Sequence, residues 1–163
     1  MPSTYTAIAT TTLSSSQTTI SFSSISSSYT DLRLVAVPFS TANGMNCQFR
    51  LNGDTGTNYS YTQMRASGST ITSTRISNDT YFNNLNMGVY TTTPQIYKYD
   101  IMNYANATTN KTVLMRFDEN TGWAACSVGL WRSTSAITSI TLTAITNQFA
   151  SGSTFTLYGI KAA

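Results

Sequence analysis

The absence of histidine limits the chemistry that this chain can perform. Nucleophile systems of the Ser-His-Asp and Cys-His types are excluded, as are zinc sites built on histidine. The two cysteines cannot supply the four thiolates of a structural zinc site. General acid–base catalysis would fall on the six acidic residues, or on lysine and tyrosine. Glycoside hydrolysis needs only two carboxylates, so it is the reaction to weigh.

The acidic side chains are typical of turns. Asp54 and Asp79 lie in predicted loops. Asp118 and Glu119 are neighbours at a predicted strand end, which points them in different directions. Because aspartate is a standard turn former, solvated turn residues are the favoured interpretation, and no catalytic residue is predicted. The full set is Asp31, Asp54, Asp79, Asp100, Asp118 and Glu119.

A second candidate is the segment Asn52-Gly-Asp54-Thr-Gly-Thr-Asn58, which has oxygen ligands at alternate positions, as calcium loops do. The segment lacks the bidentate glutamate and the full spacing of an EF-hand. A glycine-containing hairpin turn explains the same residues. We therefore predict no metal site, and no cofactor of another kind.

Aromatic side chains offer a different kind of site. Tyrosine and tryptophan stack well on a pyranose ring and also enrich subunit interfaces. Trp123 and Trp131 each flank an apolar run, which favours a place in the core or in a subunit contact over a sugar platform. A sugar platform would also include Tyr81. The candidates for contact with a glycan or another subunit are Tyr59, Tyr61, Tyr97, Tyr99, Trp123 and Trp131.

The composition indicates a folded protein that associates with others. The chain has 163 residues, of which 22 are serine and 30 threonine, while only 9% are charged. Threonine and tyrosine suit strands, and 40% hydrophobic residues argue against disorder. So few charges give little protection against association. The nine basic residues are scattered singly, so neither nucleic acid nor a membrane surface is a predicted partner.

Alternation of apolar and hydroxyl residues predicts the strands. It is clearest at Ile140–Ala144 and Thr154–Leu157, and Leu32–Val37 is expected to be a central strand. Cys47–Leu51 and the strand containing Tyr59 and Tyr61 form a predicted hairpin, whereas residues 66–79 are polar and expected to be a long loop. We predict an all-β, single-domain antiparallel β-sandwich of about eight to ten strands, and within that class a jelly roll.

The domain organisation expected is simple. Residues 1–16 predict an extended N-terminal arm, a candidate particle anchor, with an edge strand as the alternative. Residues 17–163 form the sandwich. Cys47 and Cys126 lie in apolar or alternating runs and are expected to be buried free thiols, although a disulfide depends on their Cα separation. No secretory signal and no apolar stretch of membrane-spanning length is visible.

Several phrases of the sequence are similar to those of a known family. They are MPSTYTAIATTTLSSS (Met1–Ser16), LNGDTGTNYSYT (Leu51–Thr62), IMNYANATTNKT (Ile101–Thr112), GLWRSTSAITSITL (Gly129–Leu142) and GSTFTLYGIKAA (Gly152–Ala163). They resemble short, Ser/Thr-rich virion proteins of tailed bacteriophages, of the type seen in phages of cyanobacteria and marine bacteria. The likeness covers nearly the whole chain and contains no catalytic motif. It implies a virion protein, assembled in the bacterial host cytoplasm.

Three functions are weighed. The favoured one is a non-enzymatic virion structural protein on the particle surface, a capsid decoration or cement protein. Its partners would be copies of itself, which the resemblance implies are homotrimers, and other virion proteins such as the major capsid protein. The alternative is a tail- or neck-fibre module that binds host-surface polysaccharide through its aromatic residues. An enzyme acting on host glycans is the third.

Overall fold

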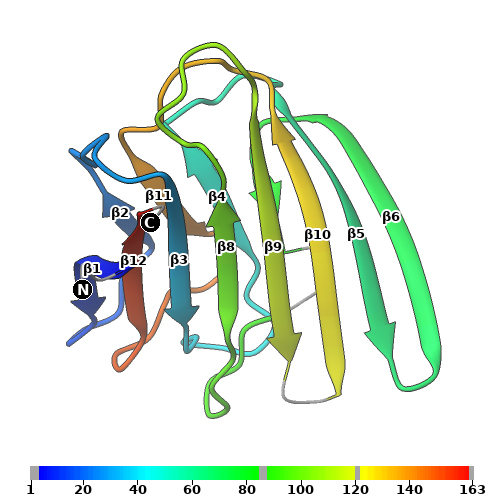
Figure 1. Cartoon of the computed structure of the whole chain (residues 1–163). Helices are drawn as coiled ribbons and strands as arrows, with labels where there is room; N and C mark the ends of the chain where they lie inside the picture. Colours follow the sequence, from blue (N-terminus) through cyan, green and yellow to red (C-terminus); the bar gives the residue numbers. More distant parts are fainter. Residues whose placement is uncertain (1–3, 85–87, 120–121, 162–163) are drawn as a thin grey trace.

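The computed structural model describes residues 4–84, 88–119 and 122–161. In these residues the chain forms twelve β-strands without any helix, which confirms the all-β fold class. None of this described part is a helix long and apolar enough to cross a membrane. The strand pairs are antiparallel throughout, and Figure 1 shows the strands in two layers.

The two sheets differ in size. In order across the sheet, the larger one consists of β1 (Tyr5–Thr12), β12 (Thr154–Ile160), β3 (Asp31–Val37), β8 (Tyr97–Ile101), β9 (Lys111–Glu119), β10 (Trp123–Trp131), β5 (Tyr59–Ser67) and β6 (Thr70–Asp79). The smaller one consists of β2 (Thr19–Phe22), β11 (Ile140–Ala144), β4 (Cys47–Leu51) and β7 (Phe82–Asn83). The antiparallel sandwich is confirmed, but a division into eight and four strands does not establish a jelly roll.

The core fills the space between the sheets. Alternate residues of β11 are buried, and the threonines between them are half-buried, as the alternation predicts. Phe49 of β4 stacks on Tyr99 of β8, with ring centroids 4.3 Å apart. Phe82 of β7 stands edge-on to Tyr59 of β5, with centroids 4.9 Å apart. Each such pair contributes about 0.5–1.5 kcal/mol beyond the burial of its area, so aromatic contacts join the two layers.

One glycine allows the sheets to approach. Gly129 lies on β10 and faces the smaller sheet, where the ring of Phe82 occupies the space that a side chain would need. A Cβ placed on Gly129 would lie 2.5 Å from Cε1 of Phe82. Phe82 is itself fully buried against several rings, so it has little freedom to move away. The close approach therefore requires glycine at this position.

The prediction of a long loop over residues 66–79 is wrong. This segment forms the end of β5, a two-residue turn at Gly68 and Ser69, and the ten-residue strand β6. Gly68 has a φ of 55°, which the tight turn needs. The side chains of β6 are exposed or half-buried on both faces, so the segment carries no apolar alternation for sequence analysis to detect. We predicted about eight to ten strands, and the structure has twelve in its described residues because of additional strands of this kind.

The N-terminal segment is an edge strand and not a free arm. β1 pairs with β12 along its length, from Tyr5 opposite Ile160 to Thr12 opposite Thr154, with a register shift between Ala7 and Ala9. The alternative that the sequence left open is therefore the observed one, and the sandwich includes β1. Residues 1–3 of the predicted arm lie outside the described residues. A role for this strand as a particle anchor stays a prediction.

We predict that Gly129→Ala destabilises the protein by about 1–3 kcal/mol, because the added methyl group overpacks the contact with Phe82. Urea unfolding of the variant and the parent chain measures the difference. Val128→Ala is the matched control on the same strand, since Val128 is exposed and its truncation should change the unfolding free energy by no more than about 0.5 kcal/mol. Equal effects of the two substitutions would contradict this view of the interface between the sheets.

Candidate contact surface

Five of the six predicted contact residues lie inside the protein. Tyr59, Tyr61, Tyr97, Tyr99 and Trp131 are each at most 2% exposed. They point from the larger sheet toward the smaller one, where an outside ligand or subunit does not reach them. The prediction of surface contacts is therefore wrong for these five. For Trp131 the core position that the sequence analysis favoured is the observed one.

The tyrosine hydroxyls find their partners within the core. The hydroxyl of Tyr59 donates to the carbonyl oxygens of Leu51 (3.3 Å) or Asp54 (3.2 Å) and accepts from the Leu51 N–H. The hydroxyl of Tyr97 accepts from Nδ2 of Asn84 at 3.0 Å and donates to Gln95 at 3.3 Å. Burial, partly offset by the Leu51 N–H, raises the pKa of Tyr59 to about 12. These bonds offset the cost of burying a polar group, and so allow tyrosine to serve as a core residue.

The carboxylate of Asp54 fastens Trp131 to the β4–β5 turn. Trp131 Nε1 donates to Asp54 Oδ2 at 2.6 Å, and Asn58 Nδ2 donates to the same oxygen at 2.9 Å. The N–H of Gly56 donates to Oδ1 at 2.8 Å. Burial opposes ionisation, but the three hydrogen bonds together hold the pKa of Asp54 below its usual 3.8. The carboxylate proposed for a calcium loop thus has a structural role within the turn.

Trp123 differs from the other five aromatic candidates because it is half-buried. It begins β10, and the Arg65 guanidinium lies over its ring, 4.4 Å from the centroid. Tyr81 is likewise half-buried, with Arg50 over its ring at 5.3 Å. One face of the Trp123 indole and one face of the Tyr81 phenol are therefore covered by an arginine of the same chain. Of the six residues proposed for glycan or subunit contact, only Trp123 is partly open to a partner.

The described aspartates are engaged by different parts of the fold. Asp100 is nearly buried on β8 and pairs with Arg33 of β3 and, at 3.5 Å, with Arg116 of β9. Asp31 accepts the N–H of Asn103 at 2.6 Å. Within the described residues no three acidic, cysteine or histidine side chains gather at one place. The side chain of Glu119 lies outside what the structure describes.

The exposed face of β10 is apolar. Its inward positions are small or aromatic: Ala125, Ser127, Gly129 and Trp131 are buried. Its outward positions are Ala124, Cys126, Val128 and Leu130. None of them carries the hydroxyl or charged side chain that is usual on a strand face in contact with water. A strand that is apolar on both sides is typical of one buried on both faces. The smaller sheet covers only the inner face, so the outer face of β10 has no cover from the described part of this chain.

Neighbouring strands add further apolar side chains to this face, although Arg116 of β9 lies beside Cys126 and Thr62 of β5 lies beside Val128. The strand register places Cys126 beside Met64 of β5, Val128 beside Leu114 of β9, and Ala66 beside Ile71 of β6. Ile71 is 73% exposed, Met64 57% and Val128 54%. Exposed apolar side chains that gather over several strands, bordered by polar ones, are typical of a contact site. We call this surface the outer patch; its residues are Met64, Ala66, Ile71, Leu114, Ala124, Cys126, Val128 and Leu130.

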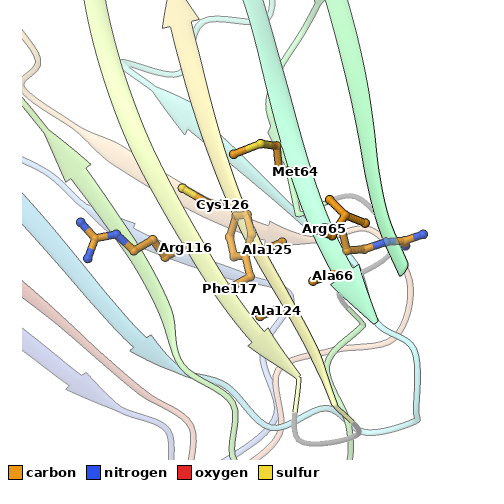
Figure 2. A pocket seen from close by; sticks show the side chains of 9 residues that line it. Met64, Arg65, Ala66, Arg116, Phe117, Ala124, Ala125 and Cys126 are labelled. Carbon is orange, nitrogen blue, oxygen red and sulfur yellow. The ribbon is translucent and has the colours of Figure 1, made fainter. Parts of the chain in front are cut away.

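The outer patch contains a shallow groove of about 450 Å³. Figure 2 shows side chains that line the groove along β9, β10 and β5, with Arg116 at one side and Met64 and Cys126 between the strands' ends. No sequence argument singled out these residues. The signal was present in the run from Ala124 to Trp131, where apolar residues occupy both alternating sets.

The two cysteines are free. Cys47 is buried on β4, and burial raises the pKa of its thiol. Cys126 is half-buried on the opposite side of the larger sheet, in the outer patch. The prediction of free thiols is confirmed, while the expected burial is confirmed for Cys47 only.

We predict that Asp54→Asn lowers the unfolding free energy by about 1–2 kcal/mol near neutral pH, because hydrogen bonds to a charged acceptor are replaced by neutral ones. A depressed pKa in the folded state stabilises the protein above the unfolded value of 3.8, and this contribution is lost as pH falls through the folded value. Urea unfolding in neutral and acidic buffers should therefore show the difference between parent and variant shrinking in acid. A difference that is independent of pH would contradict the role given to the charge.

Comparisons with known proteins identify no relatives in sequence. No protein-family model matches the chain, and no curated protein matches it. Among solved structures, an alginate lyase, Aly36B, aligns with 91% of this chain and 70% of its own chain, at 9% identity and a TM-score of 0.30. A similarity of this size carries no information about activity.

Proposed function

We propose that this chain is a non-enzymatic structural protein that works by contact, with the outer patch as its contact surface. The observation that carries the proposal is the apolar outer face of β10, next to exposed Met64 and Ile71. Burying such a surface in a partner removes apolar area from water, at about 25 cal/mol per Å². The low charge of the chain, 9% of its residues, supports the same conclusion because interface cores are poor in charge.

The location that we propose is the surface of a bacteriophage particle, where the chain would act as a capsid decoration or cement protein. Support comes from the sequence phrases that resemble phage virion proteins. The partner would then be another virion protein such as the major capsid protein, met after assembly in the host cytoplasm. The alternative, a tail- or neck-fibre module that binds glycan, retains Trp123 as its one half-exposed candidate among the six.

A charge placed in the outer patch tests the proposal. We predict that the double variant Met64→Lys with Val128→Lys binds emptied capsids of the encoding phage at least about tenfold more weakly than the parent, since each ammonium must lose its water in the contact. Both positions are more than half exposed, so the fold should tolerate the change. Co-sedimentation with the capsids measures the binding.

The matched control is Ser21→Lys, at an exposed position of β2 that faces away from the larger sheet. Its binding should equal that of the parent. Equal binding by the double variant, or an equal loss in the control, would overturn the proposal. Binding to host polysaccharide that Trp123→Ala abolishes, together with no binding to capsids, would favour the fibre alternative.

A further inference from the structure

The strand β6 is an open edge of the larger sheet. It is the last strand in the sheet order, and no other strand of the described chain pairs with its outer side. Edge strands of soluble proteins are usually protected by charge, proline or a bulge. The seven residues 70–76 of β6 (TITSTRI) carry one charge, no proline and several β-branched side chains, and pair with β5 in regular register. This edge is therefore suited to accept another strand.

The turn before β6 determines which backbone groups are free. Ser67 and Thr70 close a two-residue turn, so they form a hydrogen-bonded pair of the hairpin. Hydrogen-bonded and non-bonded pairs alternate along an antiparallel ladder. The even-numbered residues from Thr70 therefore bond to β5. The odd-numbered residues Ile71, Ser73 and Arg75 direct their N–H and C=O groups away from the sheet.

We propose that the chain forms a two-fold dimer in which β6 pairs antiparallel with β6 of a second copy, centred on Ser73. In this register Ser73 lies opposite the partner's Ser73, and Ile71 lies opposite the partner's Arg75. The backbone groups of Ile71, Ser73 and Arg75 then face the partner's Arg75, Ser73 and Ile71, and the three pairs form about six backbone hydrogen bonds. Side chains that face outward on one copy also face outward on the other, so the two larger sheets become one continuous sheet.

The side chains are compatible with this register. Ile71 is 73% exposed in the single chain, and the alkyl stem of the partner's Arg75 would cover it. Arg75 already reaches across the outer face to Oγ1 of Thr62, at 3.4 Å. The two arginines of the dimer lie four positions apart along the strands, about 13 Å, which limits their repulsion. On the inner face, Thr72 lies opposite the partner's Thr74, a favourable cross-strand pair.

The opposite edge of the sheet is less suited to this pairing. β1 carries no charge, but its register shifts within the strand, between Ala7 and Ala9. Such a bulge interrupts the ladder and twists an edge away from a flat partner. The register shift of β6 lies beyond the paired segment, between Ile76 and Asp79. Pairing through β6 alone closes the assembly at two copies. The inference goes beyond the proposed function, because it uses the backbone edge of β6. The dimer shares only Ile71 with the outer patch, and it holds whether or not that patch docks on a particle.

Cysteine cross-linking tests the register. In a Cys126→Ser background, which removes the half-buried thiol, Ser73→Cys should form a disulfide-linked dimer for most of the chain under mild oxidation. Hydrogen-bonded partners in an antiparallel pair have Cα atoms about 5.5 Å apart, which a disulfide spans. The matched controls are Thr70→Cys on β6, whose two copies would lie six positions or about 20 Å apart, and Thr10→Cys on β1. Both should stay unlinked.

Sedimentation of the unmodified chain tests the dimer itself. The parent and Ser73→Ala should sediment with twice the mass of one chain, because alanine keeps the backbone N–H. Ser73→Pro should sediment as a monomer, since proline removes that donor yet is tolerated on the free side of an edge strand. A monomeric or trimeric parent, or cross-linking that favours Thr10→Cys over Ser73→Cys, would overturn the proposal. If Ser73→Pro fails to fold, the cross-linking comparison decides.

Discussion

The packing of aromatic rings between two sheets of unequal size is the constraint on which the rest of the structure depends. Contacts such as Phe49 with Tyr99 and Phe82 with Tyr59 join the layers, and glycine at position 129 makes room for one of them. Because tyrosine hydroxyls have hydrogen-bond partners within the core, tyrosine can serve as a core residue in this chain. The outer face of the larger sheet carries mainly aliphatic, hydroxyl and charged side chains, with Tyr5 and Tyr158 beside Arg33 at the β1 end.

That division of side chains is consistent with the two different contact surfaces that we propose for a protein with so few charges. The outer patch is a face, formed by side chains of β10 and its neighbours, and its driving force would be burial of apolar area. The β6 edge is a line of backbone groups, and its driving force would be the ladder of hydrogen bonds. A dimer through the edge would bring two outer patches onto one sheet, so that both could engage the same partner with increased avidity.

Sequence alone predicts the parts of this fold in which one face is buried and the other is wet. The predicted strands at residues 47–51 and 140–144 coincide with β4 and β11, because alternation there reports burial directly. Alternation does not predict β6, because both sides of that strand are exposed or half-buried. Alternation also did not reveal the second apolar face of β10. The sequence also did not predict that the side chains of Tyr59 and Tyr97 point into the core. A tyrosine suits either face of a strand, and only the fold shows which hydrogen-bond partners its hydroxyl finds. The hydrogen bond from Trp131 to Asp54 joins residues 77 positions apart, and no local sequence pattern predicts it.

Oxidation of Met64 by hydrogen peroxide tests the central claim, that this protein works by covering its outer patch. Met64 and Met102 are similarly exposed in the single chain, at 57% and 55%, so mass spectrometry should find similar rates of sulfoxide formation in the free protein. In the protein bound to emptied particles, we expect Met64 to be strongly protected. A bound protein in which Met64 is oxidised as fast as in the free chain would contradict the account.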